Sequence, residues 1–271
     1  RGIPTETMFF GAATATELAR RFGGADLMVA NNVLAHVPDL NDFVAGFRIL
    51  LKPGGVATFE FPHLLNLIEQ NQFDTIYHEH FSYFSFHVAE QVMGRHGLTV
   101  FDVETFPTHG GSLRLYVRHE RNRMYPVSAR VESMRRKERE MGVADISGYR
   151  DFSRRVLKVK IDLLEFFVRA SRQGKKVVAY GAAAKGNTLL NYCGVGRDLI
   201  EFCADRNPHK QGQLLPGSRI PIVPPEEIER ARPDYVLILP WNLKEEIANQ
   251  LAGIREWGGQ FVVAIPGLTV F

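Results

Sequence analysis

Residues 27–61 read LMVANNVLAHVPDLNDFVAGFRILLKPGGVATFEF and decide the fold of the first part of the chain. Residues 27–30 form a short apolar run that ends at two asparagines, which is typical of a buried parallel strand meeting a polar loop. Residues 39–51 carry apolar side chains at helical spacing, and we expect this helix to stop at the Lys-Pro-Gly-Gly sequence of residues 52–55. Residues 56–61 are the next expected strand. A strand, a helix, a tight turn and a strand in this order predict the βαβ rhythm of a doubly wound α/β fold.

The alternation of strands and helices continues downstream. Residues 88–96 have a helical pattern, and residues 127–172 predict one or two long helices with one charged face. These long helices are expected to connect two α/β units, the second of which starts near residue 171. Further strands are expected at residues 98–104 and 112–118, antiparallel to each other, and at 177–180, 200–204, 236–239 and 261–265.

Length, charge and cysteine content limit the possible classes of protein. The 271 residues suffice for two domains of about 150 residues each. The formal net charge is only +3 and the basic residues are scattered, which argues against nucleic acid and mildly favours a small anionic ligand. Cys193 and Cys203 are the only cysteines and have no paired spacing, so a reducing cytoplasm is the simplest interpretation. No apolar run reaches the roughly 18 residues that span a membrane. Because the chain starts at Arg1 in the middle of a pattern, we expect a further segment upstream.

Titratable and aromatic side chains are concentrated in residues 77–85, YHEHFSYFS. A histidine beside a partly dry aromatic wall can titrate near neutral pH and act as a general base. His80 is the candidate base, Glu79 could orient or stabilise its imidazole, and Tyr77 could donate to a developing oxyanion. The alternatives for this stretch are a metal site built on the two histidines, which lacks a third ligand at helical spacing, and a purely structural aromatic cluster.

His36 is expected to belong to the same site. It follows the carboxyl end of the strand at residues 27–30, and ligands of open α/β sheets bind at that edge. A lone histidine at this point would more often be structural. A second titratable cluster after the next strand, at the same edge, favours a shared site.

Several stretches together resemble the bacterial nucleotide-sugar C-methyltransferases of deoxysugar biosynthesis. The Lys-Pro-Gly-Gly turn is common to most class I methyltransferases, whereas the Tyr-His-Glu-His block combined with Gly-Gly-Ser-Leu-Arg is specific to this family. The matching stretches are residues 31–38 (NNVLAHVP), 51–55 (LKPGG), 77–83 (YHEHFSY), 109–114 (HGGSLR), 181–187 (GAAAKGN), 205–212 (DRNPHKQG) and 239–242 (LPWN).

The resemblance implies a domain order for this chain. Residues 1–119 would be the C-terminal part of a class I, Rossmann-like methyltransferase domain that uses S-adenosylmethionine. Residues 120–170 would be a helical connector, and residues 171–271 a second Rossmann-like α/β domain. The family also has an N-terminal cysteine-rich zinc domain. This chain has no such segment, and it lacks the glycine-rich first loop and the acidic residue after the second strand that hold the cofactor. Zinc is therefore expected only in a missing N-terminal domain, and the fragment itself is expected to bind the cofactor poorly.

The resemblance also implies a reaction at a carbon of a nucleotide-linked 4-keto sugar, with removal of the proton at carbon 3. His80, assisted by Glu79, would be the base, and His36 and Tyr77 would serve the enolate oxygen or position the substrate, with the two histidines exchangeable in role. Asn31 and Asn32 would contact the cofactor.

Other predicted contacts have structural alternatives. Phe10, or its neighbour Phe9, could line the adenine of the cofactor, although such a pair is more often core. Ser112 and Arg114 could bind the substrate. The guanidinium of Arg114 could meet the diphosphate, because it matches phosphate oxygens bidentately. The alternative for Arg114 is a surface arginine in an antiparallel strand.

The loop at residues 181–187 precedes a helix and carries Lys185 and Asn187. It could bind the nucleotide at the helix N-terminus or could be only a tight turn. It lacks the Gly-x-Gly-x-x-Gly spacing of a dinucleotide site. Asp205 could take a ribose hydroxyl or cap a turn. The competing functions are methyl transfer to another carbon or oxygen acceptor and a non-catalytic nucleotide-sugar binding module.

Overall fold

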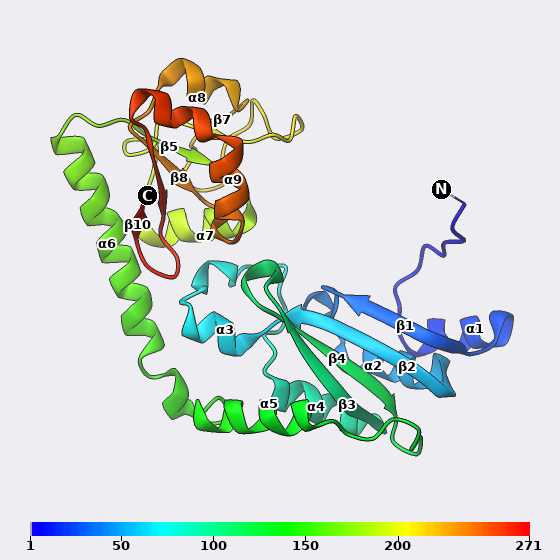
Figure 1. Ribbon diagram of the computed structural model, residues 1–271. Coiled ribbons are helices and arrows are strands. Elements are labelled where there is room, and N and C mark those ends of the chain that lie inside the picture. The colour runs from blue at the N-terminus through cyan, green and yellow to red at the C-terminus, as the bar shows by residue number, and fades with distance from the viewer. Residues whose placement is uncertain (1) are drawn as a thin grey trace. The chain divides into compact units, whose positions relative to one another are not determined.

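Figure 1 shows the computed structural model, which describes residues 2–271. Contacts along the chain divide it into two units. The first unit contains the residues up to Leu65 together with Glu79–Gly148, and the second contains Asn66–His78 and Tyr149–Phe271. The expected α/β fold is confirmed in both units.

The first unit is built on a four-stranded sheet in the order β1-β2-β4-β3. β1 pairs in parallel with β2, whereas β4 is antiparallel to both β2 and β3. This is the βαβ unit expected from residues 27–61, followed by the expected antiparallel pair. The strands are β1 (Ala25–Asn31), β2 (Leu51–Pro62), β3 (Leu98–Phe106) and β4 (Ser112–His119).

The Lys-Pro-Gly-Gly segment differs from the expected turn. The segment lies inside β2, where the register against β1 jumps from the pair Ala25–Leu51 to the pair Leu27–Val56. A Cβ atom on Gly55 would lie 2.8 Å from the carbonyl oxygen of Ala25, so the close approach of the two strands requires a glycine there. The four residues therefore form a bulge that bends β2 rather than a separate turn.

The expectation that residues 27–30 are a fully buried strand is wrong for one face of that strand. β1 is at the edge of the sheet. Met28 and Ala30 are buried, but Leu27 and Val29 are 62% and 59% exposed. A continuous apolar run therefore indicated the strand but not its one-sided burial, because the run is the same whether or not a second layer covers it.

Helices cover the core side of this sheet, where Phe59, Phe61 and Phe86 are fully buried. The carboxylate of Asp39 accepts from the backbone N–H of Asp42 and caps α2. The Asp42 carboxylate in turn accepts from the N–H of Ala12 at the start of α1, which joins the two helices. The helices of this unit are α1 (Ala12–Phe22), α2 (Leu40–Leu50), α4 (Phe86–Arg95) and α5 (Ala129–Glu140), with short 3-10 turns at Leu34–His36, Thr108–Gly110 and Ile146–Tyr149, the last of which ends in the second unit.

The second unit has a six-stranded sheet in the order β10-β9-β8-β5-β6-β7. All pairs are parallel except β9 with β10. The chain leaves β5 toward β6 on one side and returns to β8 on the other, so the carboxyl ends of β5 and β8 form a topological switch point. The strands are β5 (Val177–Tyr180), β6 (Cys203–Ala204), β7 (Ile222–Val223), β8 (Tyr235–Ile238), β9 (Gln260–Val263) and β10 (Thr269–Val270).

The 21-residue helix α6 (Phe152–Arg172) contributes Val156, Val159, Leu163 and Phe167 to the core of this unit, as its spacing predicts. The shorter helices are α3 (Leu64–Glu69), which starts in the first unit, α7 (Ala184–Cys193), α8 (Glu226–Ala231) and α9 (Lys244–Gln250), with 3-10 turns at Phe73–Thr75, Trp241–Leu243 and Ala252–Trp257. Within residues 2–271, no helix is both long and apolar enough to cross a membrane.

The boundaries of the units differ from the expected connector at residues 120–170. α5 belongs to the first unit, because Val131, Met134 and Glu138 are buried there, and α6 belongs to the second. The segment Asn66–His78, far ahead of the expected boundary, also belongs to the second unit. Helical spacing shows which face of a helix is apolar but not which core receives it.

Candidate active site

His36 and His80 lie together in the first unit. Their ring centroids are 4.8 Å apart with the rings edge to face, and the ring of Tyr83 is 5.9 Å from that of His80. His36 ends the 3-10 turn that follows β1, so it stands just past the carboxyl end of that strand. All three side chains are partly buried. The structure therefore brings together the two histidines that the sequence placed in one site, and adds Tyr83.

Backbone hydrogen bonds hold the loop of His80 against the turn of His36. The N–H groups of Phe81 and Ser82 both donate to the carbonyl of Ala35, over 2.8 and 3.3 Å. Because Ala35 and Phe81 are direct neighbours of the two histidines, these bonds fix the spacing of the imidazoles through the main chain. A neutral imidazole can accept a proton from a substrate, which is the chemistry that a general base requires.

The other two residues predicted to be catalytic belong to different units, because the boundary between the units falls between His78 and Glu79. Glu79 is in the first unit and its side chain is exposed, while Tyr77 is partly buried in the second unit. Their roles stay predictions.

Asn31 and Asn32 are exposed at the carboxyl end of β1, beside the turn that carries His36. Asn32 has a φ of 54°, a left-handed conformation that asparagine tolerates, and its N–H donates to the carbonyl of Glu60 over 2.8 Å. Both side-chain amides are therefore available to a ligand at this edge of the sheet.

The ring of Phe10 packs edge to face against Phe43 and Phe47, with centroids 5.6 and 5.2 Å away. This position favours the core role that the sequence left open over a role in lining the adenine. Phe9 is fully exposed.

Arg114 forms an ion pair with Glu60, its direct neighbour across the β2–β4 pair. Its Nη2 and Nε atoms both donate to one carboxylate oxygen, over 2.6 and 3.1 Å, and its guanidinium lies 4.3 Å from the centre of the Phe106 ring. A diphosphate would therefore have to compete with Glu60 for this cation. Ser112 is fully buried and donates to the carbonyl of Thr108, so its hydroxyl stabilises the turn before β4.

In the second unit, Lys185 lies in the first turn of α7 at the switch point. Its ammonium donates to the side-chain oxygen of Asn242 over 2.7 Å and lies 4.8 Å from the centre of the Trp241 ring. Burial lowers the pKa of Lys185, while the negative charge of Asp74 raises it, and burial dominates. The indole N–H of Trp241 donates to Asp74 over 2.8 Å. Lys185 is thus partly buried and interacts electrostatically with the buried carboxyl group of Asp74, a residue that sequence reasoning had missed.

The glycines of the loop at residues 181–187 are required for packing. A Cβ atom on Gly181 would lie 2.5 Å from the ring of Pro240, and one on Gly186 would lie 2.8 Å from Leu239. Asp205 accepts from the backbone N–H groups of Ala182 and Asn207, over 2.7 and 2.8 Å, which is the capping role that the sequence left open. These contacts explain the loop as a tight turn between β5 and α7.

Asn187, in the same loop, differs from its neighbours. Its side-chain oxygen is buried and accepts no hydrogen bond from any group of the described residues. A buried acceptor without a donor is costly, so a ligand donor at this point would stabilise the folded unit.

We expect the stability of the second unit to depend on pH through the buried carboxyl group of Asp74. Burial raises the pKa of Asp74 to about 6, although the Trp241 hydrogen bond and the charge of Lys185 lower it. Because this value lies above the ordinary one of 3.8, the folded unit holds the proton more tightly than the unfolded chain. The contribution of this group to stability is therefore greatest below pH 4 and decreases as the pH rises from about 4 to about 6, by roughly 1 to 3 kcal/mol.

The measurement is urea unfolding of Asp74→Asn and of the unsubstituted protein between pH 4 and 7. The stability difference between the two proteins should change across this range. Asp198→Asn, at an exposed position of the same unit, is the control for removal of a carboxyl group. A constant difference for Asp74→Asn would contradict a raised pKa.

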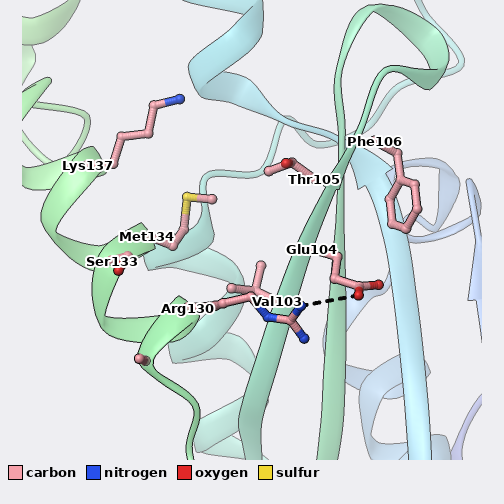
Figure 2. A pocket seen from close by; sticks show the side chains of 9 residues that line it. Val103, Glu104, Thr105, Phe106, Arg130, Ser133, Met134 and Lys137 are labelled. Carbon is pink, nitrogen blue, oxygen red and sulfur yellow. Dashed lines mark hydrogen bonds and ion pairs between the residues drawn. The ribbon is translucent and has the colours of Figure 1, made fainter.

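A hollow of about 540 Å³ opens between β3 and α5 of the first unit (Figure 2). None of the residues that the sequence predicted to be catalytic or ligand-binding lines this hollow. Its charged lining is largely neutralised, because Arg130 is paired with Asp102 and with Glu104. The hollow is lined by residues of β3 and α5, among them Met134 and Ser133. The chemistry of the first unit therefore points to the histidine pair rather than to this hollow.

Metal chemistry was an alternative for the residues 77–85 stretch. Among residues 2–271, no three His, Cys, Asp or Glu side chains are grouped so that they could hold a metal ion.

An α/β unit with two imidazoles at the carboxyl end of a parallel strand, followed by a second α/β unit, defines a Rossmann-like protein with a candidate acid–base site. A family model described as C-methyltransferase C-terminal domain matches residues 107–266, and one described as methyltransferase domain matches residues 5–103. The chain therefore belongs to the C-methyltransferase family, and the resemblance found in its motifs is confirmed.

Known proteins similar to this chain include C-methyltransferase NovU of Streptomyces niveus, with 41% identity over 271 residues. The alignment covers 98% of this chain and 63% of NovU, so the chain spans less than two thirds of that relative.

Among solved structures, magnesium protoporphyrin IX methyltransferase of Synechocystis PCC 6803, with bound SAH, is similar at 17% identity and a TM-score of 0.30, covering 37% of this chain and 48% of that one. An O-methyltransferase family protein of Burkholderia thailandensis is similar at 16% identity and a TM-score of 0.29, covering 40% of this chain and 35% of that one.

Proposed function

We propose that the protein containing this chain transfers a methyl group from S-adenosylmethionine to a carbon of a nucleotide-linked 4-keto deoxysugar, with carbon 3 as the acceptor. The observation that carries the proposal is the pair of imidazoles, His36 and His80, held 4.8 Å apart at the carboxyl end of β1. Methylation of a carbon next to a ketone requires a base for its proton and a donor for the enolate oxygen, and two adjacent histidines can supply both.

In this proposal His80 takes the proton from carbon 3, and the electron pair of the broken C–H bond moves into the enolate. His36 and Tyr77 donate to the enolate oxygen or position the sugar, and Glu79 stabilises the imidazolium of His80. The enolate carbon would then form the new carbon–carbon bond to the methyl group as the methyl–sulfur bond of the bound cofactor breaks, with its electron pair left on sulfur. His80 finally releases its proton to solvent, which restores the base.

When bound, S-adenosylmethionine supplies an electrophilic methyl group. The described residues fit part of such a site, since the amides of Asn31 and Asn32 are exposed at the carboxyl end of β1, on the same edge as His36. These two side chains would hold polar parts of the cofactor. The remaining contacts would come from the part of the protein that this chain does not span.

The diphosphate and nucleotide of the substrate need cations and polar groups. Arg114 is the proposed contact in the first unit, together with Ser112 two residues earlier in β4. In the second unit the proposal rests on Lys185 and Asn187, because they lie at the start of α7 at the switch point of the sheet. It also includes Asp205, which follows β6 and accepts from the N–H of Ala182 in the loop before α7. The buried unpartnered oxygen of Asn187 supports this assignment.

Two alternatives remain distinct from this proposal. The same fold could methylate another carbon or oxygen acceptor, because the substrate is selected by the shape of the pocket. A non-catalytic nucleotide-sugar binding module would use the second unit alone, but such a module has no need of an imidazole pair, which favours the enzyme.

The test is the product formed from S-adenosylmethionine with a ¹³C-labelled methyl group. With the full-length protein and a nucleotide-linked 4-keto deoxysugar, the expected product carries the label on carbon. The control is the corresponding 4-hydroxy sugar, which cannot form the enolate and should not be methylated. A label on oxygen would favour the first alternative, and binding without any product would favour the second.

A further inference from the structure

Glu138 and His63 form a buried pair in the first unit that the proposed reaction does not use. The His63 Nε2 atom lies 2.6 Å from Glu138 Oε1, and both side chains are almost completely buried, at 1% and 3% exposure. A carboxylate has only acceptors, so the His63 Nε2 atom must carry the proton and donate it.

Glu138 also binds the start of a helix. Its carboxylate accepts from the backbone N–H of Phe86 over 2.6 Å and from that of His87 over 2.8 Å. These are the first two residues of α4, whose N–H groups have no partner within the helix. Ser85 caps the same end by accepting from Val88. Burial raises the pKa of Glu138, but the hydrogen bonds from His63, His87 and Phe86 outweigh burial and hold the pKa below its ordinary value. The carboxylate is therefore charged at neutral pH, as the cap requires.

The segment that Glu138 fixes is the end of the His80 loop, defined here as residues 79–85. Phe84 forms a bridge with His63, its carbonyl accepts from the N–H of Leu64 over 2.9 Å, and its ring packs on Phe61. The loop is thus held at two places in this unit. The first is the carbonyl of Ala35, next to His36, and the second is the junction of His63, Phe84 and Glu138.

We propose that Glu138 is a positioning residue for the His36–His80 pair, acting through His63 and the N-terminus of α4 on the end of the His80 loop. Glu138 does not contact the reacting atoms in this assignment. Tyr83 lies between the two attachment points, and His80 directly precedes the first. The rings of Tyr83 and His80 are in edge-to-face contact, so a shift at the second attachment point reaches His80 through Tyr83 and moves both rings relative to His36. Small displacements of reacting groups are expensive, since about 1 Å can cost on the order of 10²-fold in rate.

The test uses Glu138→Gln in the full-length protein. Glutamine has nearly the same volume but replaces one acceptor oxygen by an NH₂ donor, so it cannot accept from all three groups. Glu140→Gln, on an exposed position two residues later in α5, is the matched control. His63→Gln keeps a donor for Glu138 without an imidazole, so its effect should have the same direction and be smaller.

Two readouts separate positioning from general stability. Histidine side-chain NMR should show shifted resonances of His36 and His80 in folded Glu138→Gln and unchanged ones in Glu140→Gln. In the methyl-transfer assay, kcat should fall by about 10-fold or more while the KM for S-adenosylmethionine changes less than about twofold, because the imidazoles and not the cofactor contacts are displaced.

A folded Glu138→Gln protein with unchanged histidine resonances and unchanged kcat would overturn the assignment. If this variant does not fold, the same two measurements on His63→Gln decide in the same way. The kinetic measurement rests on the proposed function, whereas the NMR measurement of the histidine resonances does not. If the unsubstituted protein gives no methylated product, the proposed function fails and the NMR result still decides whether Glu138 positions the pair.

Discussion

His80→Ala in the full-length protein is expected to lower methyl-transfer turnover by about 10²- to 10⁴-fold, the range that a positioned general base contributes. Nucleotide-sugar binding should be retained, because the substitution removes only an imidazole and leaves the proposed diphosphate and nucleotide contacts in place. The measurement is kcat together with the Kd of the sugar. A fall in kcat without a change in Kd is the signature of a group that acts mainly in the transition state.

The matched control is His87→Ala, an exposed histidine on α4 whose side chain has no role in the proposed reaction. It should leave turnover within about twofold, because surface substitutions away from a site have small effects. His36→Ala addresses the exchangeable roles of the two histidines. If His36 is the base, its variant loses more turnover than His80→Ala. Unchanged methylation by both variants would rule out the histidine pair as the acid–base group.

Phe59→Ala is expected to destabilise the first unit by about 3 to 5 kcal/mol, which is the cost of removing a phenyl ring from a close-packed core. Phe59 is fully buried in β2, and its ring centroid lies 4.5 Å from that of Phe47 on α2. The substitution therefore leaves a cavity between the sheet and the helix that follows β1, the helix whose start directly follows the turn of His36. Urea unfolding monitored by NMR signals of the first unit measures this loss.

Phe9→Ala is the control, because the same side chain is fully exposed there. It should change the stability of the first unit by less than about 0.5 kcal/mol. Equal losses of unfolding free energy in the two variants would mean that Phe59 does not pack in the core of the first unit.

The sequence predicted the positions of helices and strands better than it predicted which of their faces are buried. The βαβ unit around residues 27–61 and the antiparallel pair that follows it could be recognised because their patterns are local. The exposure of Leu27 and Val29 could not, since the pattern of β1 contains no information on its neighbours. The bulge in β2 was also missed, because Pro-Gly-Gly is equally compatible with a turn and with a bend inside a strand.

The site was predictable where it depends on chain order. His36 follows β1, and His80 belongs to the stretch richest in titratable groups, so both could be assigned to one edge of the sheet. The partners of buried charges were not predictable. Glu60 meets Arg114 through the register of β2 and β4, and His63 meets Glu138 across 75 positions of sequence. No local pattern signals such pairs, which form only when the sheet and α5 are assembled.

The position of the labelled methyl group distinguishes methylation at carbon from the alternatives. The full-length protein, S-adenosylmethionine with a ¹³C-labelled methyl group and a nucleotide-linked 4-keto deoxysugar are combined, and the product is examined by NMR. The proposed function predicts a ¹³C signal from a methyl group bonded to carbon 3, next to the ketone, and its absence with His80→Ala. A label attached to oxygen, or carbon methylation that persists unchanged in both histidine variants, would contradict this account.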